Sequence, residues 1–221
     1  MNACSRIIVI GISLFFMLSA VAYMYIENGL PWKYKKMEQQ MRTYLEERYK
    51  DEFAFDVMQF DWRNKGSYYT TATAKSTGVQ FYVAVLNAGV EEDAYSDEHW
   101  SREGERYFVP ITKQHYKEFE RLNSISLNVR FDQALPPNKQ LEEHKGYTWW
   151  NIDMHIRKEL TDDDFKTAFS ILQAIQQEGF QLEQLTLRYY DVVIQIFEEE
   201  IPLIKNAKDI TKFVKTYEEV Y

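Results

Sequence analysis

The stretch 148–158, TWWNIDMHIRK, holds the residues whose types and spacing come closest to a chemical site. Alternate side chains of a strand share one face, so this strand would place a row of polar and aromatic groups together: Trp149, Asn151, Asp153, His155 and Arg157. A carboxylate and an imidazole two residues apart could serve acid–base chemistry or bind a metal ion. Such a row is also typical of the solvated face of an antiparallel sheet, and we favour this second interpretation.

The other polar motifs have structural explanations. Asp162, Asp163 and Asp164 stand at the start of a predicted helix, where carboxylates complement the helix dipole, and the Gly and distal Glu of an EF-hand are missing. The run 198–200, three glutamates, is typical of a solvated strand end. The four histidines, His99, His115, His144 and His155, lack zinc-protease spacing, and Cys4 is the single cysteine. We therefore assign no catalytic, cofactor-binding or metal-binding residue, and predict no cofactor.

Residues 7–26 carry no charge, so we next ask where the protein resides. Twenty helical residues span about 30 Å, the thickness of a bilayer's hydrocarbon core. Ala20-Val21-Ala22 could be a signal-peptidase site, but the apolar run continues to Ile26, and aromatic residues follow at headgroup depth. We predict a short tail at 1–6 and an uncleaved transmembrane anchor at 7–26 that contacts membrane lipid.

The orientation of this anchor is left open by the flanking charges. Lys33, Lys35 and Lys36 follow the segment and by the positive-inside rule favour a cytosolic location for the rest of the chain. A very short N-terminal tail and a large part without cysteine instead suit a signal-anchored, exported bacterial protein. We expect a single-pass protein of the cell membrane with the bulk of the chain outside the cytoplasm.

Composition excludes one class of partner. The 221 residues are 45% hydrophobic and 27% charged, which is compatible with a folded chain, and the net charge is −8. An acidic surface repels phosphate backbones, so we predict no nucleic-acid partner. Aromatic residues make up 16% of the chain and are expected mainly in the core and on sheet faces.

Hydrophobic periodicity predicts an α+β fold with helices packed on antiparallel sheets, divided into two small units. The first unit, 31–122, reads as α-β-β-β-α. We expect a helix over 31–49, strands over 53–62, 67–76 and 79–86 with a bulge near Val57, an irregular acidic segment over 87–109, and a short helix over 112–122.

The second unit, 123–221, reads as β-β-α-β-α. Strands are expected over 124–132 and 147–158, and a helix over 161–178 with Thr161 as N-cap and Asp164 completing a capping box. One long strand over 183–197 changes phase at Tyr189-Tyr190. A final helix begins at Asp209.

The stretch 44–83 carries a resemblance to a known family. Tyr44-Leu45-Glu46-Glu47-Arg48-Tyr49 and the later Phe81-Tyr82-Val83 are similar to a helix end and a strand of the YfjL-like proteins of Bacillus and its relatives, although Lys50 stands where that pattern often has Gly. The resemblance covers roughly residues 1–90. It implies an anchored α+β protein of a Gram-positive bacterium and transfers no catalytic residue.

Together these features predict a membrane-anchored extracytoplasmic module that binds a protein or peptide partner or regulates it, rather than an enzyme. One alternative is an anchored hydrolase with a site near Asp153 and His155. Another is a cytosol-facing accessory subunit of a membrane complex, which the flanking lysines would favour.

Overall fold

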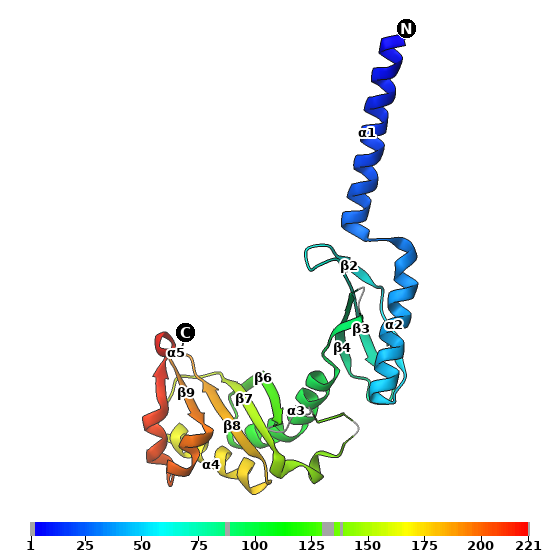
Figure 1. Cartoon of the computed structure of the whole chain (residues 1–221). Coiled ribbons are helices and arrows are strands. Elements are labelled where there is room, and N and C mark those ends of the chain that lie inside the picture. The colour runs from blue at the N-terminus through cyan, green and yellow to red at the C-terminus, as the bar shows by residue number, and fades with distance from the viewer. Residues whose placement is uncertain (1–2, 87–88, 130–134, 138, 221) are drawn as a thin grey trace. The chain divides into compact units, whose positions relative to one another are not determined.

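The computed structural model describes residues 3–86, 89–129, 135–137 and 139–220 (Figure 1). The fold is mixed α+β with two five-stranded sheets. Contacts divide the chain into two compact units, Met1–Tyr95 and Ser96–Tyr221. This division places residues 96–122 in the second unit, whereas the sequence pattern put the boundary near Leu122.

The first element is a long apolar helix, α1 (Ala3–Asn28). Within the described part of the chain it supplies the one helix that is long and apolar enough to cross a membrane. Its large side chains from Ile10 to Tyr25 are about half to two-thirds exposed, so the helix buries little of its apolar surface within the protein. The chain turns at Gly29 before the next helix begins.

The first unit contains one amphipathic helix and an antiparallel sheet. Its elements are α2 (Pro31–Tyr49), β1 (Phe53–Phe55), β2 (Gln59–Asp61), β3 (Ser67–Ala74), β4 (Gln80–Leu86) and β5 (Gly89–Asp93). The predicted helix and the first three strand regions are confirmed. The irregularity near Val57 separates β1 from β2, and both pair with β3. The strand β5 was not predicted, because its sequence GVEED lacks apolar alternation.

A buried carboxylate fastens this unit's helix to its sheet. Met37, Met41 and Leu45 of α2 are fully buried against the sheet. At the edge strand β5, the Asp93 side chain is only 3% exposed and pairs with the Arg48 guanidinium at 3.0 Å. Its carboxylate also accepts hydrogen bonds from the hydroxyls of Tyr44, at 2.9 Å, and Tyr49, at 2.6 Å.

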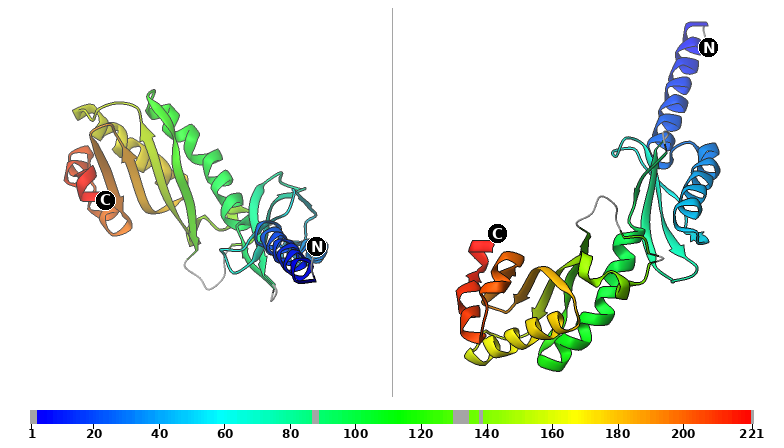
Figure 2. Two further views of the ribbon diagram at one scale, coloured as in Figure 1. Left: turned by 90° about the horizontal axis from the view of Figure 1, so that it is seen from above. Right: turned by 60° about the horizontal axis from the view of Figure 1, so that its bottom comes forward.

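The second unit has two long helices on one side of a mixed sheet (Figure 2). Its longer elements are α3 (Tyr95–His115), β6 (Phe119–Val129), β7 (Thr148–Ile156), α4 (Asp162–Gln177), β8 (Gln181–Arg188), β9 (Val192–Phe197) and β10 (Val214–Thr216). The short helices are η1 (Leu141–Glu143), η2 (Lys145–Tyr147), η3 (Glu198–Leu203), η4 (Ala207–Phe213) and α5 (Tyr217–Val220). The strand order is β10-β9-β8-β7-β6.

The predictions for β7 and α4 are confirmed in detail. Trp150, Ile152, Met154 and Ile156 are at most 1% exposed and face the helices. At the start of α4, the Asp164 carboxylate accepts hydrogen bonds from the Thr161 amide at 2.8 Å and the Thr161 hydroxyl at 2.6 Å. The capping box is therefore present, and it sets where the helix begins.

The prediction of an irregular segment followed by a helix over 112–122 is wrong. The helix α3 instead covers Tyr95–His115, and Phe119–Val129 is strand β6. Gly104 and Pro110 disfavour a helix locally, but tertiary packing offsets this cost. A Cβ atom at residue 104 would lie 2.6 Å from the Trp150 ring and 2.4 Å from Ile125, so glycine allows the helix to approach the sheet closely.

The single strand predicted over 183–197 is in fact a hairpin of β8 and β9. The change of phase at Tyr189-Tyr190 marks a turn, in which the Tyr189 amide donates to the Val192 carbonyl at 2.9 Å. The sequence of this turn has no Gly or Pro, and Asp191 is its one common turn residue. In addition β7 and β8 pair in parallel across α4, so the second sheet is mixed rather than antiparallel.

The predicted final helix is also corrected. The segment from Ala207 forms a 3-10 helix, η4, whose N-cap is Asn206, and Asp209 is its third residue. The segment then becomes the edge strand β10, which pairs with β9. Ile210 is buried in the core, and Val214 pairs with Ile194 across the sheet.

Candidate functional site

The polar face of the second sheet is the strongest candidate site in the described part of the chain. β7 alternates as its sequence predicts, so the side opposite the helices carries Trp149, Asn151, Asp153 and His155, all half-buried. Arg157 lies beyond the strand end at Ile156 and is exposed. The predicted polar row therefore exists. Neighbouring strands cover these side chains partly, so they are less exposed to solvent than those of a fully solvated sheet face.

Asp153 is held by an arginine of the adjacent parallel strand. Arg188 Nε lies 2.8 and 2.9 Å from the two carboxylate oxygens, and Nη2 lies 2.5 Å from Oδ2. Each side chain is 17% exposed. A bidentate pair with this little exposure is stronger and better oriented than an ordinary surface ion pair.

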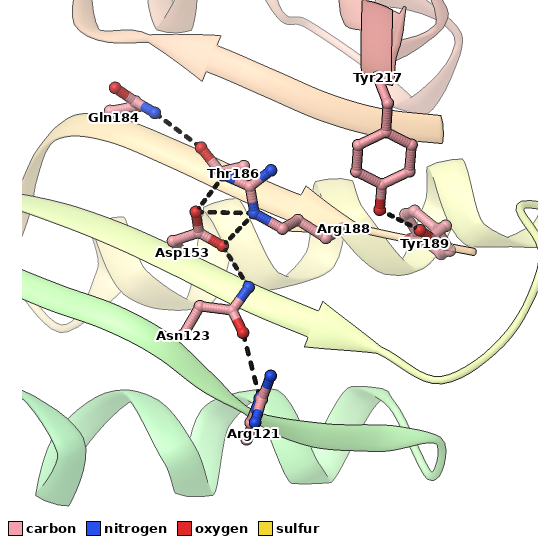
Figure 3. Close-up of polar contacts among 8 residues, drawn as sticks. All are labelled: Arg121, Asn123, Asp153, Gln184, Thr186, Arg188, Tyr189 and Tyr217. Carbon is pink, nitrogen blue, oxygen red and sulfur yellow. Dashed lines mark hydrogen bonds and ion pairs between the residues drawn. The ribbon is translucent and has the colours of Figure 1, made fainter. Parts of the chain in front are cut away.

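A bulge in β6 adds an amide to this ion pair. The register of β6 against β7 shifts between Leu122 and Ser124, which leaves Asn123 without a direct partner in the ladder. Asn123 Nδ2 donates to Asp153 Oδ1 at 2.9 Å, and Arg121 Nε donates to Asn123 Oδ1 at 3.3 Å. Figure 3 shows the resulting chain of polar contacts across three strands.

A second network lies further along the same face. Glu183 Oε2 accepts from the amide nitrogens of Asn151, at 2.8 Å, and Asn128, at 3.1 Å. Between the two networks is a shallow hollow of about 430 Å³. Its lining is mainly polar: Ser124, Ser126, Asn151, Ile152, Asp153, Glu183, Gln184 and Phe197.

The structure does not assemble the acid–base pair that the spacing of Asp153 and His155 allowed. The carboxylate is directed to Arg188 and Asn123, whereas the imidazole Nε2 lies 3.7 Å from a carboxylate oxygen of Glu120. The arrangement is suited to binding polar groups rather than to transferring protons.

The other sequence motifs take structural roles. Asp163 pairs with Lys166 at 2.8 Å, and Asp164 is buried in the capping box. In η3, Glu200 accepts from the Phe197 amide at 2.8 Å. Among the described residues, no group of three or more His, Cys, Asp or Glu side chains is arranged to hold a metal ion.

Sequence reasoning missed the groups that complete the face. Arg188 and Glu183 come from β8, which pairs with β7 only after the α4 crossover, and local periodicity gives no register for such distant strands. Asn123 is placed by a bulge. The one signal available in the sequence was the arginine that ends the segment LTLR, residues 185–188. The structure shows that the three residues before Arg188 are fully buried.

Buried tyrosines close one end of this unit. The hydroxyls of Tyr116 and Tyr189 are hydrogen-bonded to each other, and the Tyr116 hydroxyl donates to the Asp164 carbonyl at 3.2 Å. The Tyr217 hydroxyl donates to the Tyr189 carbonyl (Figure 3). Burial raises the pKa of both Tyr116 and Tyr189 far above the usual value, so both remain neutral and link α3, α4 and β8.

Comparison with known proteins adds no relative: no family model, no curated protein and no solved structure matches this chain.

Proposed function

We propose that this protein is a non-catalytic interaction or regulatory module, anchored in the cell membrane by α1 with the bulk of the chain outside the cytoplasm. The observation that carries the proposal is the polar face of the second sheet. There amide, hydroxyl and carboxylate groups surround a hollow of about 430 Å³ without forming a reactive pair.

The chemistry of this face favours a peptide or protein segment as the partner. Ser124 and Ser126 line the hollow with hydroxyls, and the Asn151 and Gln184 amides and the Glu183 carboxylate add donors and acceptors. Such a mixture of donors and acceptors can pair with the N–H and C=O groups of a peptide backbone. The hydrolase alternative has weaker support, because Asp153 and His155 have different partners. The resemblance to the YfjL-like proteins supports an anchored protein of a Gram-positive bacterium.

Site-directed photo-crosslinking in the full chain tests the partner. A crosslinking amino acid replaces Ser126, which is exposed in the hollow, or Thr71, which is exposed on the sheet of the first unit. We expect one crosslinked protein from position 126 and none from position 71. The variant Ser124→Arg, which fills the hollow, should abolish the product. Equal crosslinking at both positions would contradict a partner site on this face.

The location is tested separately on membranes. An uncleaved anchor keeps the full chain in the pellet after an alkaline carbonate wash, and its N-terminus begins at Met1 or Asn2. Protease added to cells stripped of their wall should then degrade the part beyond Glu27. Protection of that part would reverse the orientation and favour the accessory-subunit alternative. A mature N-terminus at Tyr23 would show a cleaved signal instead.

A further inference from the structure

The joint between α1 and the first unit is packed rather than flexible. Gly29 has φ +66°, and a Cβ atom there would lie 2.7 Å from the Phe60 ring and 2.8 Å from the Tyr68 hydroxyl. The Tyr68 hydroxyl accepts a hydrogen bond from the Leu30 amide at 2.9 Å, and the Tyr25 and Phe60 ring centroids are 5.9 Å apart. The last turn of α1 therefore contacts strand β2 directly, and the joint residues Gly29 and Leu30 contact β2 and β3.

These contacts fix the position of the β2–β3 turn along the axis of α1, and thus its depth relative to the bilayer. When residues 7–26 cross the hydrocarbon core, Gly29 lies in the headgroup layer, a few ångströms beyond. Phe60 of β2 contacts Gly29, so the turn that follows β2, residues 62–66, lies at about the same level. Figure 1 shows this turn beside the C-terminal end of α1.

The side chains at this level suit a membrane surface. Trp62 is 52% exposed and Trp32 is 74% exposed, and tryptophan concentrates at the membrane–water interface. An apolar hollow of about 540 Å³ lies between the end of α1 and Trp32. It is lined by Val21, Met24, Tyr25, Gly29, Leu30, Pro31 and Trp32, with almost no polar surface.

The local charge is opposite to that of the whole chain. Residues 27–36 and 61–66 contain two carboxylates, Glu27 and Asp61, and five cations: Lys33, Lys35, Lys36, Arg63 and Lys65. The whole protein carries −8. The nearby Asp61 carboxylate accepts the amide hydrogens of Arg63, at 2.9 Å, and Asn64, at 3.3 Å, and thereby shapes the turn.

We propose that the first unit docks on the membrane surface through the β2–β3 turn and the start of α2, and that anionic lipid headgroups are the ligand. Tryptophan side chains enter the interface, and Lys and Arg side chains pair with headgroup phosphates. The proposal rests on the anchoring of α1 proposed above. Its consequence is that the first sheet stands at a fixed height over the bilayer.

Spin-label accessibility in the full chain tests this docking. On a Cys4→Ser background, a nitroxide is attached at Asn64→Cys in the turn or at Gln80→Cys, an exposed residue at the other end of the sheet. The chain is reconstituted in phosphatidylcholine vesicles with or without phosphatidylglycerol. With phosphatidylglycerol, the label at 64 should be relaxed mainly by oxygen, and the label at 80 by a water-soluble nickel chelate.

Charge reversal separates lipid electrostatics from simple proximity. Arg63→Glu with Lys65→Glu should return the label at 64 to water, whereas Lys205→Glu with Lys208→Glu, exposed residues of the second unit, should leave it unchanged. A label at 64 that is as water-accessible as the label at 80, in a chain that withstands the carbonate wash, would overturn the docking alone. Release of the chain by that wash would overturn the anchor and this proposal together.

Discussion

The two sheets use their charged groups in opposite ways. In the first unit the buried carboxylate, Asp93, points toward α2 and ties the helix to the sheet edge. The outer face of that sheet carries neutral groups such as Thr71 and Tyr82 beside the exposed carboxylate of Glu92. In the second unit the helix side is apolar, and the ion pair of Asp153 with Arg188 lies on the outer face.

This difference separates charges that hold a fold from charges that can meet a partner. Asp93 is shielded from solvent by the side chains that bind it, so its interactions stabilise the first unit and leave little of the carboxylate for a partner. Asp153 and Glu183 line a hollow that is open to solvent, and their donors come from neighbouring strands. The outer face of the second sheet is therefore where a binding function is expected, and the stability of each unit should respond to different substitutions.

The largest effect should come from core truncation, confined to one unit at a time. Trp150 is fully buried between Phe108 and Phe180, and Phe53 is 1% exposed in the first unit. Trp150→Ala and Phe53→Ala should each cost about 3–5 kcal/mol. Hydrogen exchange followed by segment should show faster exchange only in the unit that carries the change.

The matched control is Trp62→Ala, which removes a half-exposed ring and should cost under about 1 kcal/mol. Faster exchange throughout both units in Trp150→Ala would show that the chain unfolds as a single cooperative body. That result would contradict the claim that the two units respond to different substitutions.

Parts of this fold follow from local sequence patterns, and the buried residues show why. The stripe Ala168, Leu172 and Ile175 repeats with the period of a helix, and the alternation from Trp150 to Ile156 has the period of a strand. In α2, four buried residues recur at intervals of four: Met37, Met41, Leu45 and Tyr49. Each pattern is produced by one face of one element, so it can be read without knowing the neighbours.

The remaining features depend on contacts between distant segments. A glycine is needed at position 104 of α3 because the Trp150 ring occupies the space where a Cβ atom would lie. The sequence around residue 104 cannot predict this contact, because Trp150 is distant in the chain. The parallel register of β7 and β8 brings Arg188 to Asp153 across 35 positions of sequence. The sequence therefore predicted the candidate site as a row of residues on one strand, but it could not predict which side chains of the neighbouring strands bind to that row.

Removal of the buried charge in the first unit should give the second-largest effect. Asp93→Asn keeps the size of the side chain but leaves Arg48, Tyr44 and Tyr49 with a weaker acceptor. We expect a loss of about 2–3 kcal/mol in the first unit, since hydrogen bonds to charged groups contribute more than neutral ones. Urea unfolding monitored by exchange in α2 measures it. A cost no greater than that of Glu92→Gln, at the exposed neighbour, would contradict the role given to Asp93.

The outer ion pair of the second unit should contribute less. Asp153→Asn should cost about 1–2 kcal/mol, and a double-mutant cycle with Arg188→Met should return a coupling energy of the same size. His155→Ala should cost about 0–1 kcal/mol, because its contact with Glu120 is 3.7 Å long and partly exposed. Equal costs in this experiment would remove the distinction that the structure makes between Asp153 and His155.

The smallest effect should be a response to mild acid that is restricted to the second unit. All four histidines lie after residue 95, and burial in α3 lowers the pKa of His99 below its usual value. Below a pH of about 6.5 the unfolded chain therefore binds a proton that the folded unit resists, so stability falls as the pH falls through that range. A single proton limits this loss to less than about 1 kcal/mol between pH 7.5 and 6. Relative to the intrinsic exchange rate at each pH, protection should fall slightly in α3 and β6 and stay constant in α2 and β4, and His99→Gln should flatten the response. An equal response in the first unit, which contains no histidine, would show that carboxylates rather than His99 cause it.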